Sequence, residues 1–435
     1  MTTAAAWETY LRQARWFGGK GLGARIAGIS ALPWYTPDGT WPAVRSELAE
    51  IAYDDGRTEI YQLLVAYVPA GSAPAGLPVG RATLAGLGEV DIVDATTHPA
   101  AMAALVGALL ADPPAGMTWR DPGPVDAAAA MRLFTGEQSN TTVMVGETTL
   151  FKLFRKLEAG RNLDAEVLGA LSGSGITPDL YGLLSHDDYD LGLFCQRITG
   201  ITDGWVYATD ACAAGRDISA ECLQLGVELR DLHARLADSF GTATRPGEDL
   251  TADMVRRFAE AAEAVHELDE YRHAAQLLFS APSGQALATQ RVHGDFHLGQ
   301  VLHRSAPAGS PWVIIDFEGE PLKTLAERRE FDSVWRDVAG LLRSLDYARS
   351  AHADPDGHEA RQWCAAAREA FLDGYSGKHR AEPALLRAYE LDKAVYEVVY
   401  EVRNRPNWAH IPWRAVQDEA RRVSLNPPAP NDKEQ

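Results

Sequence analysis

The first half of the chain shows the short, strongly apolar runs and turn signals of β-strands. Ala43–Tyr53 and Thr58–Val68 are strand-like and are separated by Asp54-Asp55-Gly56-Arg57. An Asp-Gly pair between two such runs is typical of a β-hairpin. Further strands are predicted at Met131–Thr135, Thr142–Val145, Thr149–Phe154, and in a hairpin that joins Leu180–Leu184 to Leu191–Ile198.

Two short helices interrupt these strands. One covers Ala100–Leu110, and the other runs to about Leu171 after Asn162, which is a good N-cap residue. Asp164 and Glu166 would lie in the first turn of the second helix, where the helix dipole favours negative charge.

From about Gly200 the pattern becomes helical. Leu225, Leu229, Leu232 and Leu236 recur at intervals of 4, 3 and 4 residues, which places them on one face of a helix. Further helices are predicted over Ala252–Phe279, Arg336–Ala348, Gln362–Leu372 and Ala384–Val402, the last ending before Arg405-Pro406. These patterns predict an α+β protein in three parts: a β-rich cap at residues 1–90, a sheet-rich region at 91–199 and a helical region at 200–435.

Composition narrows the class of protein. A chain of 435 residues with 46% hydrophobic and 23% charged residues is typical of a globular protein with more than one domain. Its net charge of −19 disfavours nucleic acid and anionic lipid as partners. The four cysteines have no metal-site spacing, the N-terminal segment does not resemble a signal peptide, and the longest apolar run, Ala100–Ala111, is shorter than the roughly 20 residues of a membrane span. We therefore expect a cytoplasmic enzyme with buried, reduced thiols.

The strongest chemical signal lies at His293–Leu302, which is followed by the apolar run Val313-Ile314-Ile315 and then Asp316. In phosphoryl transfer, one Asp orients and deprotonates the attacking hydroxyl, while an oxygen ligand five residues later and a second Asp hold Mg²⁺ on the nucleotide phosphates. Asp295, Gln300 and Asp316 have this order and spacing. Glu318 either assists the metal or shapes the loop.

Eight segments spread along the chain carry a family pattern: Trp16–Lys20, Gly136–Thr141, Lys152–Arg155, His293–Gln300, Asp316–Pro321, Arg336–Gly340, Arg343–Tyr347 and Tyr396–Pro406. In these segments the sequence resembles the aminoglycoside-phosphotransferase-like branch of the kinase superfamily, and within it the actinobacterial group of maltokinases and glucosamine kinases. The resemblance implies a bilobal, eukaryotic-like kinase fold with an N-terminal cap subdomain, a sheet-rich N-lobe and a helical C-lobe, and with ATP and Mg²⁺ as cofactors.

The resemblance also places the nucleotide site. Lys152 lies in an apolar strand and needs a partner, for which Glu166 is the candidate, as in the lysine–glutamate pair of kinases. The backbone of the segment that contains Gln196 and Ile198 is implied to bind adenine. The polar hairpin turn that would cover the phosphates consists of Gln138, Ser139, Asn140 and Thr141.

Three other polar residues near these motifs are interpreted as structural. His293 and Asp337 are expected to support the catalytic loop. His233, within the leucine-patterned helix, is expected to be a core histidine.

The helix at Ala384–Val402 carries two stripes. Leu391, Val395, Val398 and Val402 face the core. The other stripe is either a solvated face or, as the resemblance favours, the wall of a sugar pocket. Its members are Lys393, Tyr396, Glu397, Tyr400, Glu401 and Asn404. We predict that the pocket is formed by Glu397, Tyr400, Glu401 and Asn404, with Trp408 stacking on the sugar ring and His297 contacting the acceptor.

The choice of sugar rests on departures from the maltokinase pattern at Leu345, Phe331–Trp335 and Ala409–Trp413. A bulkier rim suits a monosaccharide, and an ammonium group gives a carboxylate a charge-assisted bond. The sequence therefore predicts phosphorylation of glucosamine to glucosamine 6-phosphate. The alternatives are a maltokinase that makes maltose 1-phosphate, an aminoglycoside phosphotransferase, and an inactive nucleotide-binding regulator, against which the intact Lys152, Asp295, Gln300 and Asp316 argue.

Overall fold

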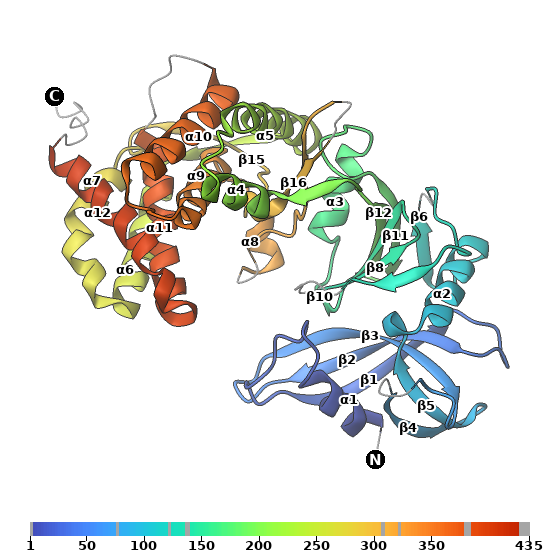
Figure 1. Cartoon of the computed structure of the whole chain (residues 1–435). Coiled ribbons are helices and arrows are strands. Elements are labelled where there is room, and N and C mark those ends of the chain that lie inside the picture. The colour runs from blue at the N-terminus through green and yellow to red at the C-terminus, as the bar shows by residue number, and fades with distance from the viewer. Residues whose placement is uncertain are drawn as a thin grey trace. The chain divides into compact units, whose positions relative to one another are not determined.

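The computed structural model describes residues 3–74, 78–120, 123–134, 140–305, 309–320, 323–377 and 384–425. They form two compact units (Figure 1). The first contains residues 1–173 and 178–199, and the second contains residues 174–177 and 200–435. The division of the first unit into a cap and an N-lobe stays a prediction.

The first unit begins with a short helix, α1 (Thr3–Leu11), and an antiparallel sheet in the order β1-β2-β3-β5-β4. The predicted hairpin is confirmed, because β2 and β3 pair from Ala43↔Tyr67 to Ala52↔Thr58. Trp7 of α1 packs with Leu63 and Tyr67 of β3 in the core of this sheet. The strands are β1 (Arg25–Trp34), β2 (Ala43–Ala52), β3 (Thr58–Pro69), β4 (Pro78–Leu84) and β5 (Gly88–Asp94).

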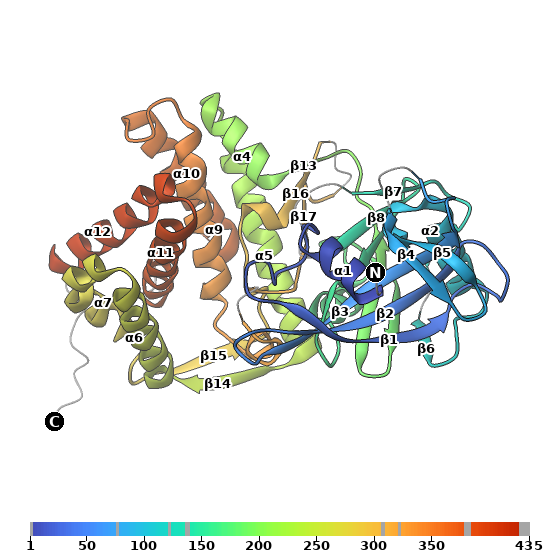
Figure 2. The same cartoon turned by 90° about the horizontal axis from the view of Figure 1, so that it is seen from below.

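A helix, α2 (Pro99–Ala111), leads to the second sheet of this unit, whose order is β6-β11-β12-β9-β8-β7. Figure 2 labels α2 and three strands of this sheet, β6, β7 and β8. Asn162 caps α3 (Leu163–Leu171) as predicted, since its Oδ1 accepts the Ala165 N–H at 3.2 Å. The two-residue strand β10 (Lys156–Leu157) pairs with β3 of the first sheet. The other strands are β6 (Met117–Arg120), β7 (Met131–Leu133), β8 (Thr141–Val145), β9 (Thr149–Leu153), β11 (Leu180–His186) and β12 (Tyr189–Gln196).

Arg155 joins the two sheets of the first unit. Its buried guanidinium donates to Asp94 Oδ2 at 2.7 Å and to Thr141 Oγ1 at 2.7 Å. It also lies 4.3 Å from the centre of the Trp16 ring. A buried charge needs hydrogen-bonding partners of this kind. Arg155 therefore links Asp94, at the end of β5, to Thr141, at the start of β8.

The second unit is mainly helical, with two small sheets. Leu225, Leu229, Leu232 and Leu236 are buried on one face of α5, as predicted. The helices are α4 (Gly204–Ala213), α5 (Ser219–Phe240), α6 (Gly247–Ala264), α7 (Arg272–Phe279), α8 (Leu325–Arg329), α9 (Trp335–Ala348), α10 (His358–Ser376), α11 (Ala384–Asn404) and α12 (His410–Leu425). The strands are β13 (Ile201–Asp203), β14 (Thr242–Pro246), β15 (Ala286–Gln290), β16 (Val301–Arg304) and β17 (Trp312–Ile314).

The helix predicted at Ala252–Phe279 was wrong as one element. Val265 is extended, with φ −138° and ψ 92°, and the 3₁₀ helix η2 (His266–Tyr271) separates α6 from α7. All four cysteines are free and buried. Among the helices in the described ranges, none is both long enough and apolar enough to cross a bilayer.

Candidate functional site

The predicted catalytic loop lies between β15 and β16 and is held from behind by Asp337. This buried carboxylate, in the first turn of α9, accepts the backbone N–H of His293 at 2.7 Å and of Gly294 at 2.9 Å. His233 Nε2 lies 2.9 Å from the same carboxylate, and His233 Nδ1 lies 2.8 Å from the Tyr375 hydroxyl. The structural roles predicted for Asp337 and His233 are confirmed.

The chemistry of Asp337 follows from these contacts. Burial opposes ionisation of the carboxyl, but the hydrogen bond and charge of His233 outweigh it and lower the pKa of Asp337. The loop therefore rests on a carboxylate that is ionised at neutral pH. His293 closes the other side of the loop, because its Nε2 lies 3.0 Å from the Ile315 carbonyl oxygen, as expected for a supporting residue.

Asp295 leaves this loop with its side chain partly exposed, at 22%. Lys393 of α11 places its Nζ 3.3 Å from Asp295 Oδ1 and 3.5 Å from Glu320 Oε1. Burial disfavours the ammonium, but these two carboxylates outweigh it and raise the pKa of Lys393. The sequence did not identify Lys393 as a site residue, although its charge within the α11 stripe was a signal.

His297 lies on the other side of Asp295, with Nε2 4.0 Å from Asp295 Oδ2. Its Nδ1 accepts the Gly299 N–H at 3.0 Å. Burial lowers the pKa of His297, although the charge of Asp295 opposes this. A neutral imidazole therefore stands beside the carboxylate.

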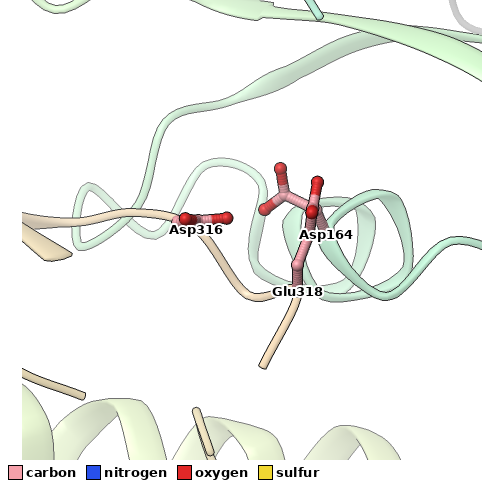
Figure 3. Close-up of side chains that lie close together, drawn as sticks. All are labelled: Asp164, Asp316 and Glu318. Carbon is pink, nitrogen blue, oxygen red and sulfur yellow. The ribbon is translucent and has the colours of Figure 1, made fainter. Parts of the chain in front are cut away.

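The predicted metal ligands are on one short stretch of the second unit. Gln300 donates from Nε2 to Asp316 Oδ2 at 3.3 Å, and carboxylate oxygens of Asp316 and Glu318 lie within 4.8 Å of each other. Figure 3 shows these two carboxylates on the segment after β17, together with Asp164, which belongs to α3 of the first unit. Asp316 has φ +64°, a left-handed conformation that is uncommon outside glycine and that often marks functional sites. Two carboxylates and an amide oxygen are a donor set that suits Mg²⁺.

Lys152 pairs with Asp164 in the first unit. Its Nζ lies 2.9 Å from Asp164 Oδ2, and both side chains are largely buried. The predicted pairing with Glu166, which lies two residues further along α3, stays a prediction.

The described part of the phosphate turn is anchored to Arg155. Asn140 Oδ1 accepts the Arg155 backbone N–H at 3.1 Å, and Thr141 Oγ1 accepts from the Arg155 side chain. Gln138 and Ser139 lie outside the described residues. At the end of β12, the N–H of Gln196 donates to the Asp179 carbonyl oxygen at 2.8 Å, and the half-buried Ile198 follows two residues later.

A cavity of about 340 Å³ opens in the second unit beside Asp295. The charged residues of its wall include Glu320. Burial alone would raise the pKa of Glu320, but the positive charges of Arg336 and Lys393 outweigh burial and lower this pKa to about 2. The α11 residues in its wall include Tyr389, Lys393 and Tyr396, and α6 contributes Arg257 and Glu260.

The predicted acceptor residues of α11 lie on the neighbouring face of the helix and do not line this cavity. Glu397 Oε2 accepts two bonds from Arg343, at 3.0 and 2.8 Å, and burial raises the pKa of Glu397 in spite of this pairing. Glu401 is buried and accepts from Tyr347 at 3.2 Å and from Arg405.

The remaining predicted acceptor residues lie near the end of the same helix. Tyr400 is exposed, and Asn404 donates to the Tyr400 carbonyl oxygen at 2.9 Å. Trp408 stacks on Tyr347, with ring centres 6.2 Å apart. Binding of a sugar by these residues and His297 stays a prediction.

Comparison with known families accounts for this arrangement. The model of the "Phosphotransferase enzyme family" matches residues 130–386, more than half of the chain. The chain belongs to this family. Residues 10–97 of this phosphotransferase match the model of the maltokinase N-terminal cap domain.

Relatives of this phosphotransferase include two glucosamine kinases. That of Streptacidiphilus jiangxiensis is 29% identical over 350 residues, covering 67% of this chain and 77% of the relative. That of Mycolicibacterium smegmatis is 28% identical over 341 residues, covering 66% and 79%.

Among solved structures, a glucosamine kinase in complex with glucosamine, ADP and inorganic phosphate superposes with a TM-score of 0.68. It is 21% identical, and the match covers 97% of this chain and 99% of that one. The predicted kinase fold is therefore confirmed over nearly the whole chain.

Proposed function

We propose that this phosphotransferase is an ATP-dependent kinase that converts D-glucosamine to glucosamine 6-phosphate. The observation that carries the proposal is Asp295, which stands on a rigid loop at the wall of a cavity of about 340 Å³. Small-molecule sites range from about 300 to 1,000 Å³, so this cavity suits a monosaccharide better than a disaccharide. The relatives named as glucosamine kinases support the same choice.

Asp295 is the group we assign to the acceptor hydroxyl. Its carboxylate would accept the hydroxyl hydrogen bond and take the proton as the bond from the acceptor oxygen to the γ-phosphorus forms and the bond from that phosphorus to the leaving ADP breaks. Lys393, 3.3 Å away, restricts where the oxygens of Asp295 point. Lys393 thus acts as a positioning residue for the base.

Gln300, Asp316 and Glu318 would hold Mg²⁺, for which their oxygens fit. A bound Mg²⁺ would neutralise charge on the nucleotide phosphates. In the first unit, Lys152 is assigned to the phosphates and is kept in place by Asp164.

The remaining nucleotide contacts follow the family pattern. The turn would lay backbone N–H groups over the phosphates. The backbone beyond β12 is assigned to adenine. These residues are Gln138, Ser139, Asn140 and Thr141 in the turn, Glu166 beside Lys152, and Gln196 and Ile198 after β12.

We assign Glu401 to the glucosamine ammonium, and because Glu401 does not line the cavity beside Asp295, this assignment places the amino group beyond the cavity wall. Both of its hydrogen bonds use Oε1, whereas Oε2 is buried and accepts no hydrogen bond within the described residues. A buried carboxylate oxygen without a donor is costly, by about 1–3 kcal/mol, and an ammonium would supply the donor. Glu397 similarly receives both Arg343 bonds on Oε2, which leaves Oε1 for the sugar.

The test is a panel of sugars with ATP and Mg²⁺, in which the product mass and the position of the phosphate are determined. Glu401→Gln should lower kcat/KM for glucosamine by about 10- to 150-fold, the loss of a charge-assisted bond, and should affect glucose much less. Glu260→Gln is the matched control, since Glu260 is an exposed carboxylate of the cavity wall. An equal effect on both sugars, or an effect confined to Glu260, would refute the assignment of Glu401.

A second candidate is a maltokinase that forms maltose 1-phosphate. The match of residues 10–97 to the maltokinase cap domain favours it. Phosphate on the anomeric carbon of maltose, with no turnover of glucosamine, would establish this function in place of the first.

A further inference from the structure

The first unit contains a second cavity, of about 280 Å³, between the end of α1 and the start of β1. Its floor is apolar and belongs to the core of the first sheet: Leu11, Phe17 and Ile51 are all buried there. None of its lining residues is among those assigned above to nucleotide, metal or sugar. The cavity is therefore unexplained by the kinase reaction.

Three cations surround this apolar floor: Arg12, Lys20 and Arg25. All three are exposed, and within the described residues none of their side chains has a hydrogen bond or ion pair. The lining contains one acid, Glu8, and its Oε1 accepts the Ile26 N–H at 2.9 Å. The wall thus carries three positive charges and one negative charge in a protein whose net charge is −19.

The loop that presents Lys20 is built of glycines. Gly21 and Gly23 have φ of +75° and +66°, conformations that favour glycine. Turns of this kind direct backbone N–H groups into concave surfaces that attract anions. Asp54 approaches Gly23 from the β2–β3 turn, since a Cβ on Gly23 would lie 1.9 Å from Asp54 Oδ2.

Gly19 shows why the motif Trp16-Phe17-Gly18-Gly19-Lys20 has its composition. A Cβ at Gly19 would lie 2.5 Å from the Phe17 ring and 2.8 Å from the Tyr53 hydroxyl, so no larger residue fits. The close approach places Phe17 in the floor of the cavity and Lys20 in its wall. The motif, which the kinase chemistry leaves unused, forms one side of this cavity.

We propose that this cavity binds a small phosphate monoester. The phosphate would be held by Arg12, Lys20 and Arg25, because guanidinium groups bind phosphate with two parallel hydrogen bonds and ammonium groups add a point charge. The carbon body of the ester packs on Phe17 and Leu11. The volume suits a body no larger than a monosaccharide.

The experiment is calorimetric titration of the full-length protein, with and without saturating ADP and Mg²⁺, so that the nucleotide site is blocked in one arm. The probes are glucosamine 6-phosphate, glucose 1-phosphate, AMP and inorganic phosphate, which separate sugar esters from nucleotides and from the free anion. We expect a phosphate ester to bind equally in both arms. Its affinity should fall by about tenfold to a hundredfold in Arg12→Gln and in Lys20→Gln.

The control is Arg57→Gln, an exposed cap cation whose partner Asp55 is also exposed. It should bind the probe as the wild type does. The cavity variants should also keep the wild-type melting temperature and the wild-type rate of sugar phosphorylation without added ester. The proposal is refuted if no ester binds to the blocked protein, if inorganic phosphate binds as well as every ester, or if Arg57→Gln weakens binding equally. Because the readout is binding, it is independent of which sugar the kinase site accepts.

Discussion

Loss of Asp337 should damage both the stability of the second unit and the activity of the protein. This residue is buried and accepts from His293, Gly294 and His233. Removing the Asp337 carboxylate leaves three buried donors without an acceptor, at about 1–3 kcal/mol each. Because water that enters the site can accept from some of them, the free energy of unfolding should fall by roughly 3–6 kcal/mol. That is a large part of the 5–15 kcal/mol that typically holds a domain folded.

Asp337→Asn is the better test, because the amide keeps the shape and one acceptor oxygen. We expect it to be destabilised by about half as much and to lower kcat by roughly 100-fold, since a shift of about 1 Å in the Asp295 loop has that effect. Urea denaturation and steady-state kinetics measure the two losses. The KM for ATP should change little.

The matched control is Tyr375→Phe, which removes only the hydroxyl beside His233 Nδ1. It should cost about 0.5–1.5 kcal/mol and leave kcat close to wild type, because both loop N–H groups keep their acceptor. If Asp337→Asn unfolds like the wild type and retains its kcat, the loop does not depend on Asp337.

The difference in free energy of unfolding between the wild type and Asp337→Asn should depend on pH in a defined direction. The pKa of Asp337 is lowered in the folded state, so its contribution is present above the unfolded pKa of about 3.9 and is lost as the pH falls towards the folded value. The difference in free energy of unfolding between wild type and Asp337→Asn should be complete at pH 7 and should shrink only below about pH 4. A difference that already disappears at pH 6 would contradict this assignment.

Three further variants test the reaction itself. Asp295→Asn should reduce kcat by about 10²- to 10⁴-fold with nucleotide affinity nearly unchanged, and near-normal turnover would exclude it as the base. Asp316→Ala should abolish Mg²⁺-dependent turnover while the circular dichroism melt stays close to wild type; persistent turnover would remove it from the metal site. Lys152→Ala should impair catalysis far more than Lys156→Ala, because the second variant breaks only an exposed ion pair with Glu59. Equal, small effects of the two substitutions on catalysis would make Lys152 a structural residue.

Elements with local signals were predicted well from the sequence. The β2–β3 hairpin follows from its Asp-Gly turn, and α3 follows from the Asn162 cap. Four helices of the described residues were missed: α4, the five-residue α8, the short Ala-rich α1, and α12. In α12, Pro412 obscured the helical pattern, although the first turn of a helix tolerates proline. The break at Val265 was also missed, because the apolar period continues across it.

Within the candidate site, sequence spacing was enough to predict which residues lie together when all of them belong to one short segment of the chain. Asp295, Gln300 and Asp316 follow each other along the chain, and the amide of Gln300 and the carboxylate of Asp316 meet as the spacing suggested. Contacts set by packing were less accessible. Asp164 and Glu166 both occupy the first turn of α3, and only the tertiary arrangement shows that Asp164 reaches Lys152.

The sugar pocket illustrates the same limit. A helical stripe gives candidates but not the face that borders a cavity, since neighbouring positions on a helix differ by about 100°. Lys393, Tyr396, Glu397 and Glu401 all belong to the predicted stripe, but of these four Lys393 and Tyr396 line the cavity beside Asp295 and the two glutamates do not.

The buried pair of Arg155 and Asp94 means that the N-terminal sheet cannot be treated as a detachable accessory. A chain shortened to begin after Asp94 would lose both the counter-charge of the Arg155 guanidinium and the Trp16 ring that packs on it. Arg155 also donates to Thr141, which ends the phosphate turn. Amide hydrogen exchange should therefore show β5, β8 and β9 opening together as one cooperative block, so that a ligand bound by the cap would also steady the nucleotide half of the kinase.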